Sequence, residues 1–406
     1  MNRPTLEVGD IFRKYTPAFL DRYDSVLSTE QRRVLKDLAL CRTAALGGHV
    51  EECDQCGQQR IAYNSCRNRH CPKCQALARA RWMADRAKEL LPVEYFHVVF
   101  TLPDDLALLG LQNPRVVYNL LFQAAAQTML QLAADPKHLG ANIGFLTVLH
   151  TWGQNLHLHP HLHCVVPGGG ISLDGSRWVS CRPGFFLPVR VMSRLFRGKF
   201  VAFLDEAFQG EHLRLHGQLQ GLADAKAFQK LLDQLRAKEW VVYAKPPFGG
   251  PEQVLKYLAR YTHRVAISNH RLIKMEDDKV FFHYKDYADE QAQKVLSLDA
   301  VEFMRRFLQH VVPKGFMRIR HFGFLANRFR AEKLKRCREL LQNAEEPPSA
   351  SAPRRELAPD TATELPVERH RCPHCGNGRM IIVERFERGS SPATRCTEPA
   401  CVDNTS

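Results

Sequence analysis

The chain has 406 residues, and its 45% hydrophobic content is typical of a globular protein rather than a disordered one. That length exceeds one ordinary domain and is ample for a buried core. The net charge of +14 favours a polyanionic partner, although charge alone fits DNA, RNA or an acidic membrane surface equally. No apolar run approaches the roughly 20 residues of a membrane span, and no signal peptide opens the chain. We therefore expect a cytoplasmic protein with no membrane partner.

Residues 1–92 are expected to form a helical and zinc-binding domain. Helical patterns cover residues 9–20 and 29–45, and a basic helix is expected over 75–91. Two C-x-x-C pairs, separated by 14 residues, lie between these helices. This spacing is close to that of a structural tetrathiolate zinc site. The expected Zn²⁺ ligands are Cys53, Cys56, Cys71 and Cys74.

Two other potential ligands, Cys66 and His70, lie between the C-x-x-C pairs, so exchange of one ligand stays open. Basic residues surround the same segment. Arg67, Arg69 and Lys73 would give the zinc module a positive face suited to phosphate, and we expect them to bind DNA.

The next segment is expected to build a sheet with helices. Residues 93–101 read as a buried strand ended by Pro103. An apolar helix is expected over 114–133, and a second strand over 144–151. This strand would pair in antiparallel fashion with the histidine-rich strand that follows it.

Four histidines at alternate positions form the most informative stretch of the chain: His157, His159, His161 and His163. Alternate residues of a β-strand point to the same face, which would bring all four imidazoles together. Neutral imidazole is the commonest side-chain metal ligand, so the run predicts a metal site on one face of a sheet. The alternative is a histidine-rich tract that binds metals loosely. His161 and His163 are the better pair, because Pro160 interrupts the strand before them.

Helices are expected near 190–209 and 222–238, and a third begins at Pro251, which suits a first helical position. Tyr257 and Tyr261 are four residues apart in this third helix, so they share a face at the edge of its apolar stripe. Their hydroxyls could line a cleft, although tyrosines at this spacing are usually half-buried core. A tyrosine hydroxyl attacks a phosphodiester only with help from a metal or a base.

The rest of the chain is expected to hold short elements and a linker. The predicted strands cover 264–268, 271–276 and 279–284, and the predicted helices cover 299–311 and 324–342. Residues 343–369 are rich in Pro, Ala and Glu and are expected to be a flexible linker between a nuclease domain at 93–342 and the C-terminal module.

Residues 370–406 are expected to form a second zinc module, a zinc ribbon tethered by the linker. Its expected ligands are Cys372, Cys375, Cys396 and Cys401. His370 and His374 are possible substitutes for one thiol. The remaining cysteines lack a partner pattern and are expected to be buried, inert thiols: Cys41, Cys164, Cys181 and Cys337.

Taken together, the His-hydrophobic-His strand, the Tyr-x-x-x-Tyr helix and its continuation through residue 269 resemble the rolling-circle transposases of the insertion sequence 91 family. These belong to the two-tyrosine branch of the His-hydrophobic-His nucleases. The segment 63–74 also looks like their N-terminal zinc module. The resemblance runs from the first cysteine cluster to about residue 330.

The resemblance implies that His161 and His163 bind a catalytic Mg²⁺ or Mn²⁺, and that Tyr257 and Tyr261 are the nucleophiles. It does not fix the third metal ligand, for which His159, His157 and His263 are candidates in falling order. The implied reaction cleaves single-stranded DNA at element ends and target sites. It proceeds through a 5′-phosphotyrosine intermediate, and two tyrosines would permit successive strand transfers.

The residue pattern and the resemblance both predict an α+β fold. It would have an antiparallel-sheet nuclease core with helices on one face, flanked by two zinc modules. Arg260 and Arg264, beside the tyrosines, are expected to contact DNA, although a solvated basic face is the simpler alternative. Two other functions stay open. One is a plasmid replication initiator or relaxase with the same chemistry, and the other is a non-catalytic, zinc-dependent nucleic-acid-binding regulator.

Overall fold

The computed structural model describes most of the chain, and its mixture of helices and antiparallel sheets confirms the α+β class. The described residues are 6–248, 265–286, 289–290, 292–343, 371–390 and 392. Within them, no helix is long and apolar enough to cross a membrane.

A five-stranded antiparallel sheet forms the centre of the molecule, with the strand order β13-β5-β6-β3-β9. Its strands are β3 (Tyr95–Thr101), β5 (Gly144–Trp152), β6 (Leu158–Pro167), β9 (Val242–Phe248) and β13 (Ile319–Gly323). The histidine-rich strand β6 is the middle strand, flanked by β5 and β3. It therefore has neighbours on both sides that can add residues to its two faces.

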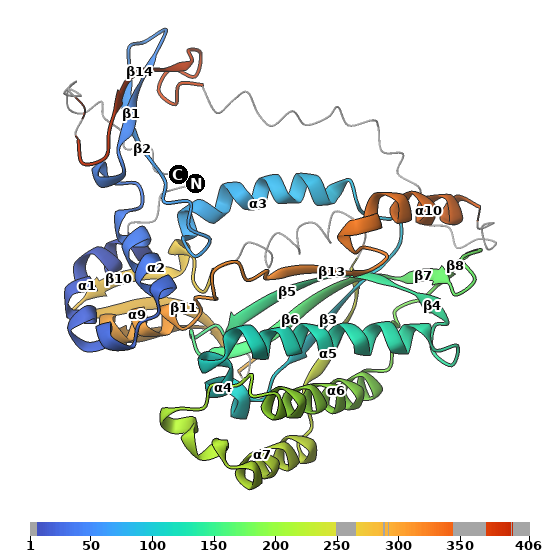
Figure 1. Ribbon diagram of the computed structural model, residues 1–406. Coiled ribbons are helices and arrows are strands. Elements are labelled where there is room, and N and C mark those ends of the chain that lie inside the picture. The colour runs from blue at the N-terminus through green and yellow to red at the C-terminus, as the bar shows by residue number, and fades with distance from the viewer. Residues whose placement is uncertain are drawn as a thin grey trace.

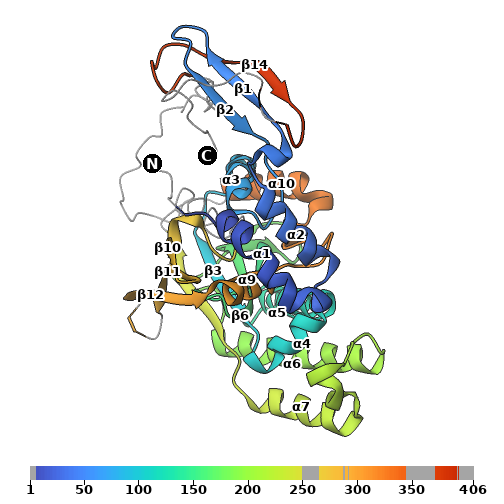
Figure 2. The ribbon, with the colours of Figure 1, turned by 90° about the vertical axis from the view of Figure 1, so that its left-hand side faces the viewer.

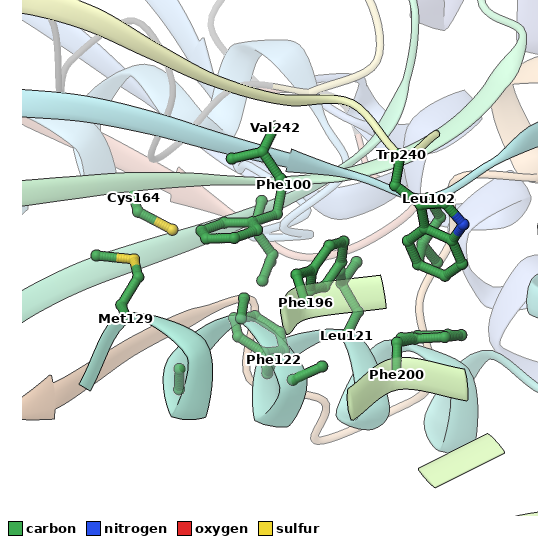
Figure 3. Packing of buried hydrophobic residues seen from close by; sticks show 14 of the residues in the cluster. Phe100, Leu102, Leu121, Phe122, Met129, Cys164, Phe196, Phe200, Trp240 and Val242 are labelled. Carbon is green, nitrogen blue, oxygen red and sulfur yellow. The ribbon is translucent and has the colours of Figure 1, made fainter. Parts of the chain in front are cut away.

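One face of this sheet carries the main hydrophobic core. Helices α5 (Pro114–Ala134) and α6 (Val189–Gln209) lie beneath it in Figure 1, with α4 (Ala107–Gln112) and α7 (Ala225–Ala237) farther out. Figure 3 shows Phe100 and Cys164 of the sheet packed over Phe122 of α5 and Phe196 of α6. These side chains are fully buried, and each large one contributes about 1.5–3 kcal/mol by leaving water. This core fixes the sheet on α5 and α6, and the side chains of the opposite face do not take part in it.

A second hydrophobic core joins the N-terminal helices to residues 266–308. Helices α1 (Val8–Tyr23) and α2 (Thr29–Leu40) pack on α9 (Ala300–Leu308), and the Phe12 and Phe307 rings meet edge-on at 5.3 Å. The same core includes a three-stranded sheet of β10 (Leu272–Glu276), β11 (Lys279–Asp286) and β12 (Ala292–Asp299). The N-terminal helices thus share a core with residues about 260 positions away instead of forming a unit of their own.

A third sheet stands at the top of the molecule in Figures 1 and 2 and combines N- and C-terminal strands. Its order is β14-β1-β2, from β1 (Gly48–Cys53), β2 (Gln59–Tyr63) and β14 (Met380–Phe386). Helix α3 (Pro72–Ala87) then crosses above the central sheet, on the side opposite α5 and α6 (Figure 1). The expectation of helices on one face alone is therefore incomplete.

Smaller elements complete the described structure. A three-stranded sheet contains β4 (Ala141–Asn142), β7 (Gly169–Ser172) and β8 (Trp178–Ser180), and α10 (Arg330–Gln342) packs nearby. Short 3-10 turns lie at Asp24–Val26, Ala44–Leu46, Asp104–Leu106, Gly217–Ala223, Asn269–Arg271 and Asn327–Phe329.

Three sequence-based boundaries are corrected by the structure. The described part of the expected strand at 264–268 is irregular, and the expected helix at 324–342 begins only at Arg330. The helix expected over 29–45 ends at Leu40, because Cys41 is extended and its thiol turns toward other cysteines. Tertiary contacts thus override local helix propensity here.

Candidate active site and zinc centres

Three histidines converge on the face of the central sheet opposite the main core. His161 and His163 lie two residues apart on β6, so both point to this face. His150 is directly opposite His161 in the pairing of β5 with β6. One ring nitrogen from each of the three lies within 4.8 Å of the other two. The sequence-predicted pair is therefore brought together, and β5 adds a third imidazole.

The hydrogen bonds of His161 and His163 turn their Nε2 atoms toward each other. His161 Nδ1 lies 2.6 Å from the carbonyl oxygen of His159 and donates to it, which leaves Nε2 as the lone-pair nitrogen. His161 Nε2 is 3.1 Å from His163 Nε2. Two ligands at right angles, each about 2.1 Å from one ion, would be about 3.0 Å apart. The imidazoles thus fit a shared divalent cation.

A fourth histidine supports this cluster from behind. His97 of β3 stacks on His163 with 5.1 Å between the ring centroids, and its Nε2 is 2.9 Å from His163 Nδ1. Burial, reinforced by Lys245 and His161, lowers the pKa of His97 to about 3, so this ring is neutral. With Nε2 of His163 facing the cluster, its Nδ1–H donates to His97. His97 therefore orients His163 in the way that outer partners orient metal-bound imidazoles.

His159, the first candidate for the third ligand, does not join the cluster. The His159 side chain is 43% exposed and its Nδ1 lies 3.9 Å from Asp104 Oδ1. The expectation of His159 as third ligand is corrected: its carbonyl oxygen fixes His161, while the third imidazole near the pair comes from His150. His159 lies in the half-buried first part of β6, before Pro160, whereas the strand is buried from Leu162 onward. His263 lies outside the described residues.

Sequence reasoning missed His150 and His97. Each lies within a segment predicted as a strand, and each alternates with apolar residues that face the main core. A histidine in a buried strand next to a histidine-rich strand was the available signal. Only the register between strands places His150 opposite His161, and register is a long-range property.

The two predicted nucleophiles, Tyr257 and Tyr261, lie outside the described residues, as do Arg260 and Arg264. The described chain enters this segment from β9 and resumes at Val265. Strand β9 pairs with β3, which carries His97.

Eight cysteines form two clusters, and neither has the grouping expected from the sequence. One cluster contains Cys41, Cys66, Cys71 and Cys74, and the other contains Cys53, Cys56, Cys372 and Cys375. The predicted set of Cys53, Cys56, Cys71 and Cys74 is therefore wrong as a single site. Cys41, expected to be inert, and Cys66, left open as an alternative ligand, are both members of the first cluster.

We call the first group the N-terminal cluster (Cys41, Cys66, Cys71, Cys74). The Sγ atoms of Cys41 and Cys66 each lie 3.6 Å from that of Cys74, and Cys71 is 3.6 Å from Cys41. Thiolates about 2.3 Å from a tetrahedral zinc ion are about 3.8 Å apart, whereas disulfide sulfurs are about 2 Å apart. Hydrogen bonds from the neighbouring thiols lower the pKa of Cys74, which favours the thiolate. The geometry fits zinc.

We call the second group the split cluster (Cys53, Cys56, Cys372, Cys375), because its halves are more than 300 residues apart in sequence. Cys53 and Cys375 sulfurs are 3.7 Å apart, and those of Cys56 and Cys372 are 3.6 Å apart. Backbone N–H groups of Gly378 and Asn377 lower the pKa of Cys375 to about 6. These N–H···S contacts are typical of zinc knuckles and stabilise thiolates.

Strand pairing holds the split cluster together. Six residues of β1 pair with β14, from Gly48 opposite Phe386 to Cys53 opposite Met380. The two knuckles also share backbone hydrogen bonds, from Asp54 N to Arg379 O and from Arg379 N to Asp54 Oδ1. The C-terminal segment therefore completes the N-terminal hairpin, and the expected independent tethered ribbon is corrected. Cys396 and Cys401, its other predicted ligands, and His370 lie outside the described residues.

Two of the basic residues expected to bind DNA have structural partners instead. Arg69 donates three hydrogen bonds, to the carbonyl oxygens of Val312, Pro313 and Phe316. Lys73 pairs with Glu7 at 2.7 Å, and both side chains are about nine-tenths buried. Burying these charges is tolerated because each is paired or hydrogen-bonded. Only Arg67 of the three is exposed.

An antiparallel sheet with a histidine centre, joined to two cysteine clusters of zinc geometry, defines a zinc-binding protein with a candidate metal-dependent active site. Comparisons with known proteins give the family. A profile described as "Transposase zinc-binding domain" matches residues 11–102, and one described as "Putative transposase" matches residues 144–333.

Two relatives agree with this assignment. The chain is 56% identical to a protein named putative transposase y4qJ from Sinorhizobium fredii, over 98% of this chain and 99% of the relative. It is 29% identical to the transposase for insertion sequence element IS801 from Pseudomonas savastanoi pv. phaseolicola, over 87% and 83% respectively. No solved structure matches the chain. The chain belongs to the insertion sequence 91 family of transposases.

Proposed function

We propose that this transposase nicks and rejoins single-stranded DNA by tyrosine attack during rolling-circle transposition, with Tyr257 and Tyr261 as nucleophiles. The observation that carries the proposal is the convergence of His150, His161 and His163 on the face of the central sheet opposite the main core. Such a centre suits Mg²⁺ or Mn²⁺, which would polarise a scissile phosphate. The proposal extends to a cytoplasmic protein that acts on element ends and target DNA.

The proposed reaction has two steps, cleavage and resealing of the strand. In the first step, one tyrosine oxygen forms a bond to phosphorus and gives up its proton, and the bond from phosphorus to the 3′ oxygen breaks. That oxygen takes up a proton and leaves as a free 3′ hydroxyl, while the 5′ phosphate stays on tyrosine. Because the phosphotyrosine ester keeps the bond energy, a second hydroxyl can displace the tyrosine and reseal the strand.

The sheet would supply the rigid frame for this chemistry. His161 and His163 are fixed by the His159 carbonyl oxygen and by His97, so neither ring has to reorient when the cation binds. Preorganised groups cost no rearrangement at the moment of reaction. This fixing supports a catalytic site rather than a loose metal-binding tract.

We also propose zinc at both cysteine clusters, as a structural ion in each. In this grouping Cys41 and Cys66 join Cys71 and Cys74 at one ion, and Cys53 and Cys56 join Cys372 and Cys375 at the other. We also keep as a proposal the order of the modules along the chain, with boundaries at about residues 92, 342 and 370. Arg67, Arg260 and Arg264 are proposed DNA contacts.

A covalent-adduct gel tests the proposed function. The full chain would be incubated with single-stranded oligonucleotides that carry candidate element ends, with Mg²⁺ or Mn²⁺. A denaturant-resistant adduct is expected for the native chain and not for the Tyr257→Phe, Tyr261→Phe double variant. Tyr243→Phe is the matched control, because Tyr243 is half exposed on β9 of the same sheet. An adduct that persists in the double variant would overturn the proposal.

A further inference from the structure

A large groove lies on the helix side of the molecule, away from the histidine face. It has a volume of about 1050 Å³ and runs between the start of α2, the junction of α4 with α5, and the segments 212–216 and 311–314. In Figure 2, α2 lies directly above α4 in this region. Its volume matches the upper end of small-molecule pockets, about 300–1,000 Å³, but it is open to solvent along its length.

The lining of the groove is strongly basic. Arg115, Arg214, Arg305 and Lys314 line it, together with two exposed histidines, His212 and His216. The one acid among these lining residues, all of them described, is Glu30. Arg305 is paired with Glu302. Within the described part of the chain, the other three cations have no carboxylate partner, so their charge is available to an anion.

The residues that carry these cations are held in place by hydrogen bonds. Asn113 donates to the Arg214 carbonyl oxygen at 3.0 Å and accepts from the Arg214 N–H at 2.7 Å. Gln112 does the same with His216, at 3.1 and 3.3 Å. Two side-chain amides thus bind the backbone of residues 214–216 as a strand would. This preorganisation lowers the entropy that a ligand must otherwise overcome.

Hydrogen bonds also hold the opposite wall of the groove. Arg115 donates to the Lys314 carbonyl oxygen at 2.8 Å, and Arg69 donates to the carbonyl oxygens of Val312 and Pro313, which precede Lys314. Since Asn113 is used by Arg214, it makes no cap hydrogen bond to α5. The N–H groups of Arg115 and Val116, which line the groove at the start of this 21-residue helix, therefore receive no side-chain cap, and the positive end of the helix dipole favours an anion there.

Apolar side chains lie between the charges. Tyr23 is half exposed in the lining, and Val26 beside it is 74% exposed. Leu111 and Val311 line the other walls. A cationic groove with aromatic and apolar platforms suits single-stranded nucleic acid, whose phosphates need charge and whose bases need flat surfaces. The bases of a duplex are paired and stacked, so they could not rest on these side chains.

Helix α9 lies between the groove and the loop that leads to the histidine-rich strand. Arg306, next to the groove residue Arg305, donates to the carbonyl oxygen of Asn155 at 3.4 Å. Asn155 precedes β6, and His161 follows it by six residues, which span at most about 20 Å. A DNA strand that left the groove past α9 would therefore reach the start of the β-strand that carries the metal-site histidines.

We propose that this groove binds the single-stranded DNA that flanks the phosphate to be cleaved. The inference deepens the proposed function and rests on it, because the strand in the groove is the substrate of the histidine and tyrosine site. Phosphates contact Arg115, Arg214, Lys314 and the start of α5, and bases rest on Tyr23 and Val26. The groove supplies affinity without sequence reading, and the chemistry occurs at the sheet.

Binding of a fluorescent oligothymidylate of about 15 nucleotides, measured by anisotropy across a salt series, tests the groove. The full zinc-loaded chain would be compared with R214Q/K314Q, which changes two exposed side chains and leaves their backbone contacts intact. The matched control is K226Q/K230Q, an equal charge change at two exposed lysines of α7. Magnesium and manganese are left out, so no cleavage enters the measurement.

We expect R214Q/K314Q to bind about tenfold more weakly at low salt, with a salt slope smaller by about 1.4, the value for two lost single-strand phosphate contacts. K226Q/K230Q keeps the native affinity. Equal losses in the two variants, or none in either, would overturn the groove. A loss seen only with duplex DNA would overturn its assignment to a single strand. Adduct formation by R214Q/K314Q at saturating DNA separates the two proposals, because a failed groove leaves the tyrosine chemistry intact.

Discussion

The grouping of the cysteines can be tested by counting zinc ions in paired variants. The structure assigns Cys53 and Cys372 to the split cluster and Cys71 to the N-terminal cluster. A Cys53→Ala, Cys372→Ala variant should therefore lose one zinc per chain, because both changes affect one site. A Cys53→Ala, Cys71→Ala variant should lose both ions. The grouping suggested by sequence spacing makes the opposite prediction for each pair.

The size of the effect follows from the ligand set. A structural zinc site contributes about 10–16 kcal/mol of apparent binding free energy, and we expect a site that lacks one or two of its four thiolates to lose the ion during gel filtration. Zinc would be measured by elemental mass spectrometry on the purified chain. Cys181→Ala serves as control, because Cys181 belongs to neither cluster. One ion left in the Cys53→Ala, Cys71→Ala variant would refute the split cluster.

Three further predictions follow from single contacts. Gly378→Ala should remove the split-cluster zinc alone, because an added Cβ would contact Cys53 Sγ and lie 2.8 Å from Asp54 Oδ1; two ions retained per chain would contradict this. His150→Ala should lower metal-dependent adduct formation about 100-fold or more while His159→Ala leaves it within about twofold, as metal titrations of adduct yield would show. Burial lowers the pKa of His310 to about 4, and the unfolded chain takes up that proton near pH 6.5. The free energy of unfolding should thus decrease as the pH is lowered, by about 1 kcal/mol between about pH 7 and pH 5.5. Urea titrations of His310→Gln, which no longer titrates, should lack this part of the loss.

The central β-sheet shows how far sequence patterns reach. The alternation of His161 and His163 with apolar residues predicted their shared face, since a period of two is a local property. The third imidazole could not be predicted, because His150 meets them only through the register of β5 on β6. His159, the first candidate for the third ligand, instead contributes its carbonyl oxygen, which accepts a hydrogen bond from His161.

The grouping of the cysteines also depends on contacts between residues far apart in the sequence. Two C-x-x-C pairs 14 residues apart have the spacing of one site, yet the β1–β2 hairpin turns Cys53 and Cys56 away from Cys71. Their partners are Cys372 and Cys375, which arrive with β14 from the far end of the chain. Cys41 lacked any motif and is placed by the end of α2. Motif spacing identified zinc-type knuckles correctly and could not say which knuckles meet.

The most direct test of the tyrosine mechanism is to find the atom that carries the DNA. The covalent adduct formed with a single-stranded element end would be trimmed with nuclease, digested with protease and sequenced by mass spectrometry. We expect a nucleotide linked through its 5′ phosphate to Tyr257 or Tyr261, and no such peptide from a His161→Ala, His163→Ala variant. A nucleotide on any other residue, or an adduct that survives loss of both histidines, would contradict it.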